Sequence, residues 1–174
     1  TDEGTTDEGT TDEGTTDEAT TDEGTTDEGT TDEGTTTGGS GETCADALVI
    51  NTVPHVVTGD TSQFKDSYAF AEGACPGEDL GWGLEAPDVV YAFTPPSSGT
   101  YDIKLVPLYD STLYVVSDCE DLDNQCLAAN DELGVNTESL TLSLSQNKTY
   151  FIIVDGYGTN SQGAYELSIS EPCV

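Results

Sequence analysis

The sequence contains no methionine and no arginine, and its 174 residues include only three lysines, one histidine and one tryptophan. Against the three lysines stand 35 aspartates and glutamates, which give a formal net charge of −32. This balance argues against nucleic-acid binding, because neutralising phosphates needs a basic surface. An anionic membrane surface would repel the chain, and the sequence has no apolar run of membrane-spanning length. Divalent cations and basic proteins are the partners that such a charge favours.

Residues that could form a catalytic site are equally scarce. His55 is the only histidine and lies in a short β-branched run, so a Ser-His-Asp triad would have to form there. A lone histidine in a strand is usually structural or exposed. Among 35 acidic residues, pairs of carboxylates arise by coincidence, so counting them gives no support to glycosidase chemistry. The sequence therefore predicts a protein that is not an enzyme.

The first 35 residues are seven tandem copies of Thr-Asp-Glu-Gly-Thr, with Ala19 replacing glycine in the fourth copy. This acidic tail carries 14 carboxylates and nothing larger than alanine among its apolar residues, so it cannot bury a core. Residues 36–41 form a Gly/Ser/Thr linker, and residues 42–174 are long enough for one folded domain. We expect the tail to be a self-repelling spacer, or an extended element that mediates assembly by strand addition.

The folded part shows many short runs that are β-branched or alternate between apolar and polar residues. No window has a convincing helical period, and turn residues separate the runs. These features predict an all-β fold, an antiparallel β-sandwich of jelly-roll type with about eight strands. Residues 73–87 are expected to be a long loop, and residues 118–130 a loop rather than a helix. The expected strands, of which 64–71 is the weakest, are residues 45–50, 55–58, 64–71, 88–94, 100–106, 112–117, 138–144, 149–154 and 163–170.

Several of these runs carry motifs of a known family. In order they are Gly59-Asp-Thr, Ala86-Pro-Asp-Val-Val-Tyr-Ala-Phe, Ser98-Gly-Thr-Tyr, Asp110-Ser-Thr-Leu-Tyr-Val, Thr149-Tyr-Phe-Ile-Ile-Val-Asp-Gly and Gly163-Ala-Tyr-Glu-Leu. Together, over residues 42–170, they resemble the bacterial pre-peptidase C-terminal domain, in the cysteine-containing version found in secreted and surface proteins. The resemblance implies a non-catalytic jelly-roll module, and some members of that family bind matrix polymers and calcium. This chain departs from the usual arrangement because it has no peptidase domain.

The five cysteines lie in the folded part and include no Cys-x-x-Cys pair. Cys119 and Cys126 bracket a short acidic loop, which favours a local disulfide over a zinc site, and Cys44 with Cys75 is the natural second pair. A bond between Cys44 and Cys173 is the main alternative. Otherwise Cys173 stays unpaired or forms an intermolecular bond. We expect a mature, exported protein of the bacterial cell surface, from which a targeting segment has been removed.

Calcium is the cofactor that the acidic turns favour, because it prefers about six to eight oxygen ligands. The resemblance places an N-terminal acidic segment near the Gly-Asp turn, which gives a first candidate group. A second group lies in and after the acidic loop between two cysteines. The alternative is that these acids only end strands and keep the surface soluble. The first group is Glu42, Asp60 and Asp66, and the second is Asp118, Glu120, Asp121 and Asp123, followed by Asn130 and Asp131.

Trp82 and Tyr157 are aromatic residues in glycine-flanked loops, where a glycan- or protein-binding platform would lie. Both could equally fold back onto the sandwich.

We weigh three interpretations of the whole chain. The first is a subunit of an extracellular filament or surface appendage that self-associates through the tail. The second is a carbohydrate- or matrix-binding module on an acidic stalk, and the third is an accessory domain of a secreted hydrolase.

Overall fold

The computed structural model describes residue 1 and residues 37–76, 83 and 85–171. Residues 2–36, Trp82 and Cys173 lie outside these ranges, so what the sequence predicts for the repeat and for these two residues stays a prediction. The chain divides into two units, residues 1–30 and residues 31–174. The second unit contains the fold described below.

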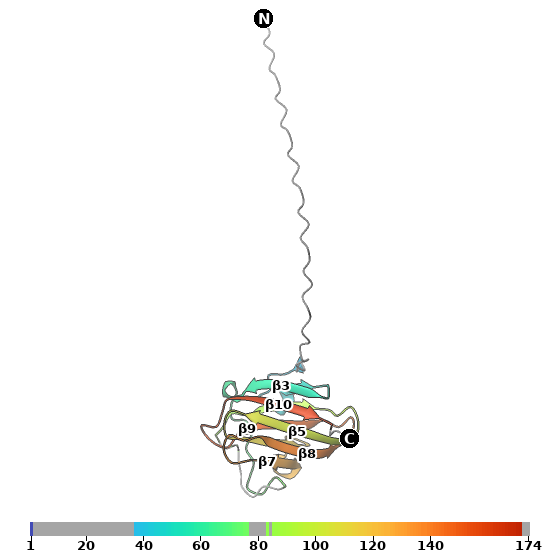
Figure 1. Cartoon of the computed structure of the whole chain (residues 1–174), viewed down its shortest axis with the longest axis vertical. Helices are drawn as coiled ribbons and strands as arrows, with labels where there is room; N and C mark the ends of the chain where they lie inside the picture. The colour runs from blue at the N-terminus through green and yellow to red at the C-terminus, as the bar shows by residue number, and fades with distance from the viewer. Residues whose placement is uncertain (2–36, 77–82, 84, 172–174) are drawn as a thin grey trace. The chain divides into compact units, whose positions relative to one another are not determined.

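The described residues form two facing β-sheets, and Figure 1 shows β3, β10, β5 and β8 side by side in one of them. This sheet has the order β3-β10-β5-β8, and the other has the order β1-β2-β4-β9-β6-β7. Neighbouring strands are antiparallel, apart from the parallel pair β2 and β4. The predicted all-β sandwich is confirmed. The strands are β1 (Thr37–Gly38), β2 (Leu48–Ile50), β3 (His55–Asp60), β4 (Val89–Phe93), β5 (Gly99–Pro107), β6 (Ser111–Val116), β7 (Cys126–Asn130), β8 (Glu138–Leu144), β9 (Tyr150–Gly156) and β10 (Ala164–Ser170).

The main core lies between the two sheets and follows from the alternation of the sequence. On β5, Tyr101, Ile103 and Leu105 point inward and are at most 1% exposed, while the residues between them are more exposed. Tyr91 of β4 and Tyr165 of β10 meet across the core, with their hydroxyl oxygens 2.6 Å apart. This hydrogen bond joins the two sheets and satisfies two buried hydroxyls.

A second apolar cluster covers the outer face of the six-stranded sheet. Residues 61–76, here called the covering segment, begin with the 3-10 helix η2 (Thr61–Gln63) and then cross this face. Phe70 of the segment stacks on Tyr114 of β6, with ring centroids 4.0 Å apart. The main core covers one face of β6 and this second cluster covers the other, so all residues of β6 are buried.

Two disulfides, Cys44–Cys119 and Cys75–Cys126, fasten the chain to this face. The pairs expected from the sequence, Cys44–Cys75 and Cys119–Cys126, are therefore wrong, and so is the alternative bond from Cys44 to Cys173. The short helix α1 (Leu122–Gln125) lies between Cys119 and Cys126. It directs Cys126 into β7, where the covering segment brings Cys75, and leaves Cys119 beside the 3-10 helix η1 (Cys44–Asp46).

Two further segments differ from the expected structure. Residues 64–71 form no strand, because their backbone joins no ladder. Tyr68 and Phe70 lie on the outer face of the six-stranded sheet, and Phe64 packs against the main core. Residues 118–130 are more than a loop, since they contain α1 and β7. β7 is an edge strand that pairs with β6 only, with a register irregularity next to Val116.

Candidate functional site

Two buried carboxyl groups lie where β4 begins and β9 ends. Asp88 immediately precedes β4 and is completely buried. Its Oδ2 accepts hydrogen bonds from the backbone N–H groups of Ser67, at 2.7 Å, and Tyr68, at 2.8 Å. Its own N–H donates to the carbonyl of Lys65. Asp88 thus holds the covering segment against the start of β4, while its Oδ1 has no hydrogen-bond partner among the described residues.

Asp155 lies beside Asp88 because of the sheet register. Val89 pairs with Val154, so residues 88 and 155 form the next position along the antiparallel ladder. Asp155 is also completely buried. Its Oδ1 accepts the N–H of Gly156 at 2.6 Å, and its Oδ2 has no partner among the described residues.

Gly83 closes the space over Asp155. It has a positive φ of 76°, and a β-carbon on this residue would overlap with Asp155 Oδ2. The same β-carbon would lie 3.2 Å from the carbonyl oxygen of Tyr68. A glycine is therefore needed here, and a backbone carbonyl oxygen faces the same small space as the unpartnered carboxylate oxygen.

The pKa values of both carboxyl groups are raised. Burial raises the pKa of Asp88 to about 6, the two N–H donors oppose this, and the charges of Asp66 and Glu42 add to it. Burial also raises the pKa of Asp155 well above its ordinary value, and the nearby charge of Asp88 raises it further. We call Glu42, Asp66, Asp88 and Asp155 the junction cluster. It concentrates negative charge that either protons or a cation would neutralise.

The junction cluster contains two of the three residues in the first calcium group expected from the sequence. Glu42 and Asp66 lie near Asp88, whereas Asp60 caps η2, where its Oδ1 accepts the N–H of Ser62 at 2.9 Å. In the sequence, Asp88 and Asp155 lie at the ends of expected strands, where turn chemistry is an ordinary explanation for an aspartate. Their complete burial shows that this explanation is incomplete. Their position directly beside strongly apolar strands is the signal that could have identified them.

The second calcium group is dispersed. Its loop members accept hydrogen bonds within the protein: Asp118 accepts the N–H of Glu120 and Asp121 accepts the side-chain amide of Asn124. Asp123 accepts the N–H of Ala71 in the covering segment. Asp131 lies apart from them, near Glu138 at the start of β8. Within the described ranges, no three Asp, Glu, His or Cys side chains stand ready to hold a metal ion.

Glu138 is a further buried carboxyl that the sequence analysis missed. It is completely buried, and its Oε2 accepts the N–H of Glu132 at 2.8 Å. Burial raises the pKa of Glu138 to about 7, the N–H donor opposes this, and Asp131, Glu132 and Asp110 add to it. The pKa of Glu138 therefore lies close to neutral pH, above that of Asp88.

His55 and Tyr157 are the remaining candidates with described positions. His55 is 2% exposed, its Nδ1 lies 3.4 Å from the hydroxyl of Thr52, and burial lowers its pKa. This neutral imidazole inside the sandwich fits a structural histidine. Tyr157 is 44% exposed at the end of β9, and its N–H donates to the carbonyl of Asp110. It is accessible to a ligand.

No protein-family model and no curated protein matches the sequence. Solved structures do match. A pre-peptidase C-terminal domain of collagenase from Bacillus anthracis is 17% identical, with 71% of this chain and 92% of that chain covered and a TM-score of 0.43. PliG from Aeromonas hydrophila, a periplasmic inhibitor of g-type lysozyme, is 13% identical, with 72% and 96% covered and a TM-score of 0.46. A β-glucosidase from Kluyveromyces marxianus matches at 13% identity over 51% of this chain and 10% of the enzyme, with a TM-score of 0.37.

The two disulfides indicate an exported protein, since such bonds persist in oxidising compartments. In the part of the chain that the structure describes, no helix has the length and apolar character needed to cross a bilayer.

Proposed function

We propose that this chain is an exported, non-catalytic β-sandwich module in which the junction cluster binds calcium. The observation that carries the proposal is the pair of buried carboxylate oxygens without a partner among the described residues, Asp88 Oδ1 and Asp155 Oδ2. Buried polar atoms are normally satisfied. Two such atoms on neighbouring strands, with raised pKa values, are what a missing cation would leave.

Calcium is the cation that fits this ligand chemistry. Every candidate ligand is an oxygen, from the four carboxylates of the junction cluster and the carbonyl of Tyr68. Asp66 is exposed and Glu42 is partly exposed, so both can move inward while water completes the coordination. Calcium bound here would tie the start of the folded domain to the covering segment and to β4, because Glu42, Asp66 and Asp88 belong to these three parts.

The burial of the titratable groups supports a non-catalytic role. Asp88, Asp155 and Glu138 are completely buried and His55 is 2% exposed. A general acid or base must reach the proton that it transfers, directly or through one water. These four groups are enclosed in the fold, so they are suited to structure and cation binding.

Calcium is expected to raise the melting temperature of the protein, and Asp155→Asn is expected to remove most of this increase. At a free calcium concentration about 100 times Kd, binding stabilises a fold by about 2.7 kcal/mol. That corresponds to an increase of roughly 5–10 °C in Tm for a domain of this size. The measurement is calorimetry in EDTA and across a calcium titration. In EDTA at neutral pH, Asp155→Asn should melt no lower than the unsubstituted protein, because the side chain of asparagine is neutral without taking up a proton on burial.

Glu166→Gln is the matched control, because Glu166 is an exposed carboxylate on β10. It should keep the full response to calcium. A protein lacking residues 1–36 should also keep it, which separates the junction cluster from the 14 carboxylates of the tail. The proposal fails if calcium leaves Tm unchanged, or if Asp155→Asn responds as strongly as Glu166→Gln.

For the tail we propose a role in assembling such modules into an extracellular filament or surface appendage, or in spacing them. Its repeated Asp-Glu pairs and the fifth cysteine, Cys173, support this. Analytical ultracentrifugation with and without calcium should show oligomers of the full chain that disappear when residues 1–36 are deleted. A monomer under all conditions would instead favour the binding-module interpretation, with Tyr157 and Trp82 as its contact residues.

A further inference from the structure

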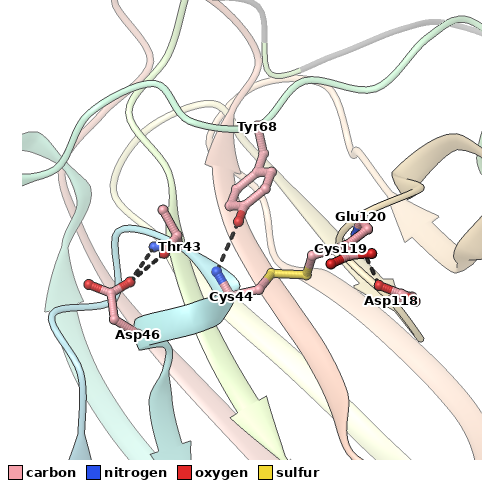
Figure 2. The surroundings of a disulfide bond; sticks show 7 residues. All are labelled: Thr43, Cys44, Asp46, Tyr68, Asp118, Cys119 and Glu120. Atoms are coloured by element: carbon pink, nitrogen blue, oxygen red, sulfur yellow. Dashed lines mark hydrogen bonds between the residues drawn. A yellow bond between two sulfur atoms is a disulfide. The ribbon is translucent and has the colours of Figure 1, made fainter.

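A hollow of about 370 Å³ opens beside the Cys44–Cys119 disulfide. It lies between η1, the turn that follows β6 and the outer face of β9. Besides the disulfide, its walls include Thr43, Tyr68, Asp118, Glu120 and Phe151. Figure 2 shows the disulfide, with Tyr68 on one side and Asp118 and Glu120 beyond Cys119.

Two aromatic rings give the hollow flat apolar walls. The hydroxyl of Tyr68 accepts the N–H of Cys44 at 2.9 Å, which fixes the ring next to the disulfide (Figure 2). Phe151 lies on the outer face of β9 and is partly exposed. Aromatic rings held in this way offer their negatively polarised faces to a ligand.

The rim of the hollow is acidic. Asp118 and Glu120 are exposed, and the N–H of Glu120 donates to Asp118 Oδ1 at 3.0 Å, so the turn that carries both carboxylates is defined (Figure 2). Asp46 lies on the far side of Thr43, and hydrogen bonds from Ser40 and Thr43 lower its pKa to about 2. None of the residues that line the hollow is basic.

We propose that this hollow binds a lysine or arginine side chain from a basic partner protein. The aliphatic part of the side chain would lie along Tyr68 and Phe151, and its charged end would reach Asp118 and Glu120. Long basic side chains combine an apolar stem with a charged tip, and cations are attracted to aromatic faces as well as to carboxylates. Its carboxylates are not those of the junction cluster, although Tyr68 contributes to both sites through different atoms.

Charge decides between the partners that could supply such a side chain. An anionic ligand would be repelled by the rim and by a chain of net charge −32. A second copy of this chain has only three lysines and no arginine, so it offers few side chains of the required kind. A basic protein is attracted at long range as well as at the site.

The test uses Nα-acetyl-lysine methylamide as the probe and the norleucine derivative as its uncharged counterpart. Both are titrated into the full, isotope-labelled chain, and the amide resonances are followed by NMR. The lysine derivative should produce saturable shifts at residues 43–45, 118–120 and 151. Asp118→Asn together with Glu120→Gln should weaken its binding about tenfold, since two exposed ion pairs each contribute a modest amount. Phe151→Leu should weaken it several-fold by removing the ring.

Glu166→Gln is again the control and should bind the probe as the unsubstituted protein does. The arginine derivative should shift the same resonances. The proposal is overturned if no saturable shifts occur at the hollow, if the norleucine derivative binds equally well, or if the double variant keeps full affinity. The substituted carboxylates are exposed, so the variants keep the fold, which the unchanged spectrum of the remaining residues will verify.

Discussion

Replacing both Cys75 and Cys126 by alanine is expected to lower the free energy of unfolding by about 2–4 kcal/mol. The two cysteines are separated by 51 residues, and opening so long a loop releases much conformational entropy in the unfolded chain. Cys75 also belongs to the apolar cluster over the outer face of the six-stranded sheet. Urea denaturation followed by fluorescence gives the change in free energy.

Thiol counting on the same variant tests the connectivity. If Cys75 bonds to Cys126, the double variant exposes no more free thiols than the unsubstituted protein. If the pairs were Cys44–Cys75 and Cys119–Cys126, each substitution would release one partner, and the count would rise by two unless the two released thiols re-paired. Peptide mapping under non-reducing conditions resolves that case. The matched variant with alanine at Cys44 and Cys119 should lose a similar free energy, because that loop spans 75 residues.

Without calcium, the protein is expected to be more stable near pH 5 than near pH 8. The folded-state pKa values of Asp88, about 6, and Glu138, about 7, lie above those of the unfolded chain. The folded state therefore holds protons that the unfolded state releases. The stability from these groups is fully present below the unfolded pKa values and is lost as pH rises through the folded ones. Asp155 contributes in the same direction.

The expected loss between these pH values is on the order of 1–3 kcal/mol, after allowance for solvent screening. It would appear as a decrease of several degrees in Tm, measured in EDTA. Glu138→Gln should flatten the pH profile without changing the response to calcium, whereas Asp155→Asn should flatten the profile and remove that response. A Tm that rises steadily from about pH 5 to pH 8 would contradict the assigned burial of these carboxyls.

The strands that the sequence predicts best are those with strict alternation. Residues 138–144 carry leucine at every second position, and β8 occupies the same seven residues. β7 was missed because Cys126–Asn130 is short and includes two alanines, which have little preference for strands. Residues 64–71 also contain three aromatic residues, but the rings of Tyr68 and Phe70 cover a sheet face while the backbone stays outside the ladders.

The disulfides and the candidate site depend on contacts between distant segments. Nothing in the spacing of the cysteines shows that the covering segment carries Cys75 to Cys126, 51 residues further along the chain. Asp88 and Asp155 resemble ordinary turn residues in the sequence, and only the register of β4 with β9 brings them together. The covering segment contacts Asp88 and Gly83 lies against Asp155, and both contacts contribute to burial of the carboxyls. No local sequence pattern predicts these contacts.

The interleaved disulfides determine how the module would carry a mechanical load. A pull applied through residues before Thr37 reaches Cys44 and passes directly to Cys119 through the sulfur atoms. The chain between these cysteines stays out of the load path, even if every strand in it separates. Cys44 and Cys119 are separated by 75 residues, and an extended chain spans roughly 3.5 Å per residue. The intact disulfide therefore keeps about 26 nm of chain from being stretched. In an oxidising environment the unfolded module would therefore act as a short tether, and a reducing one would release the hidden length.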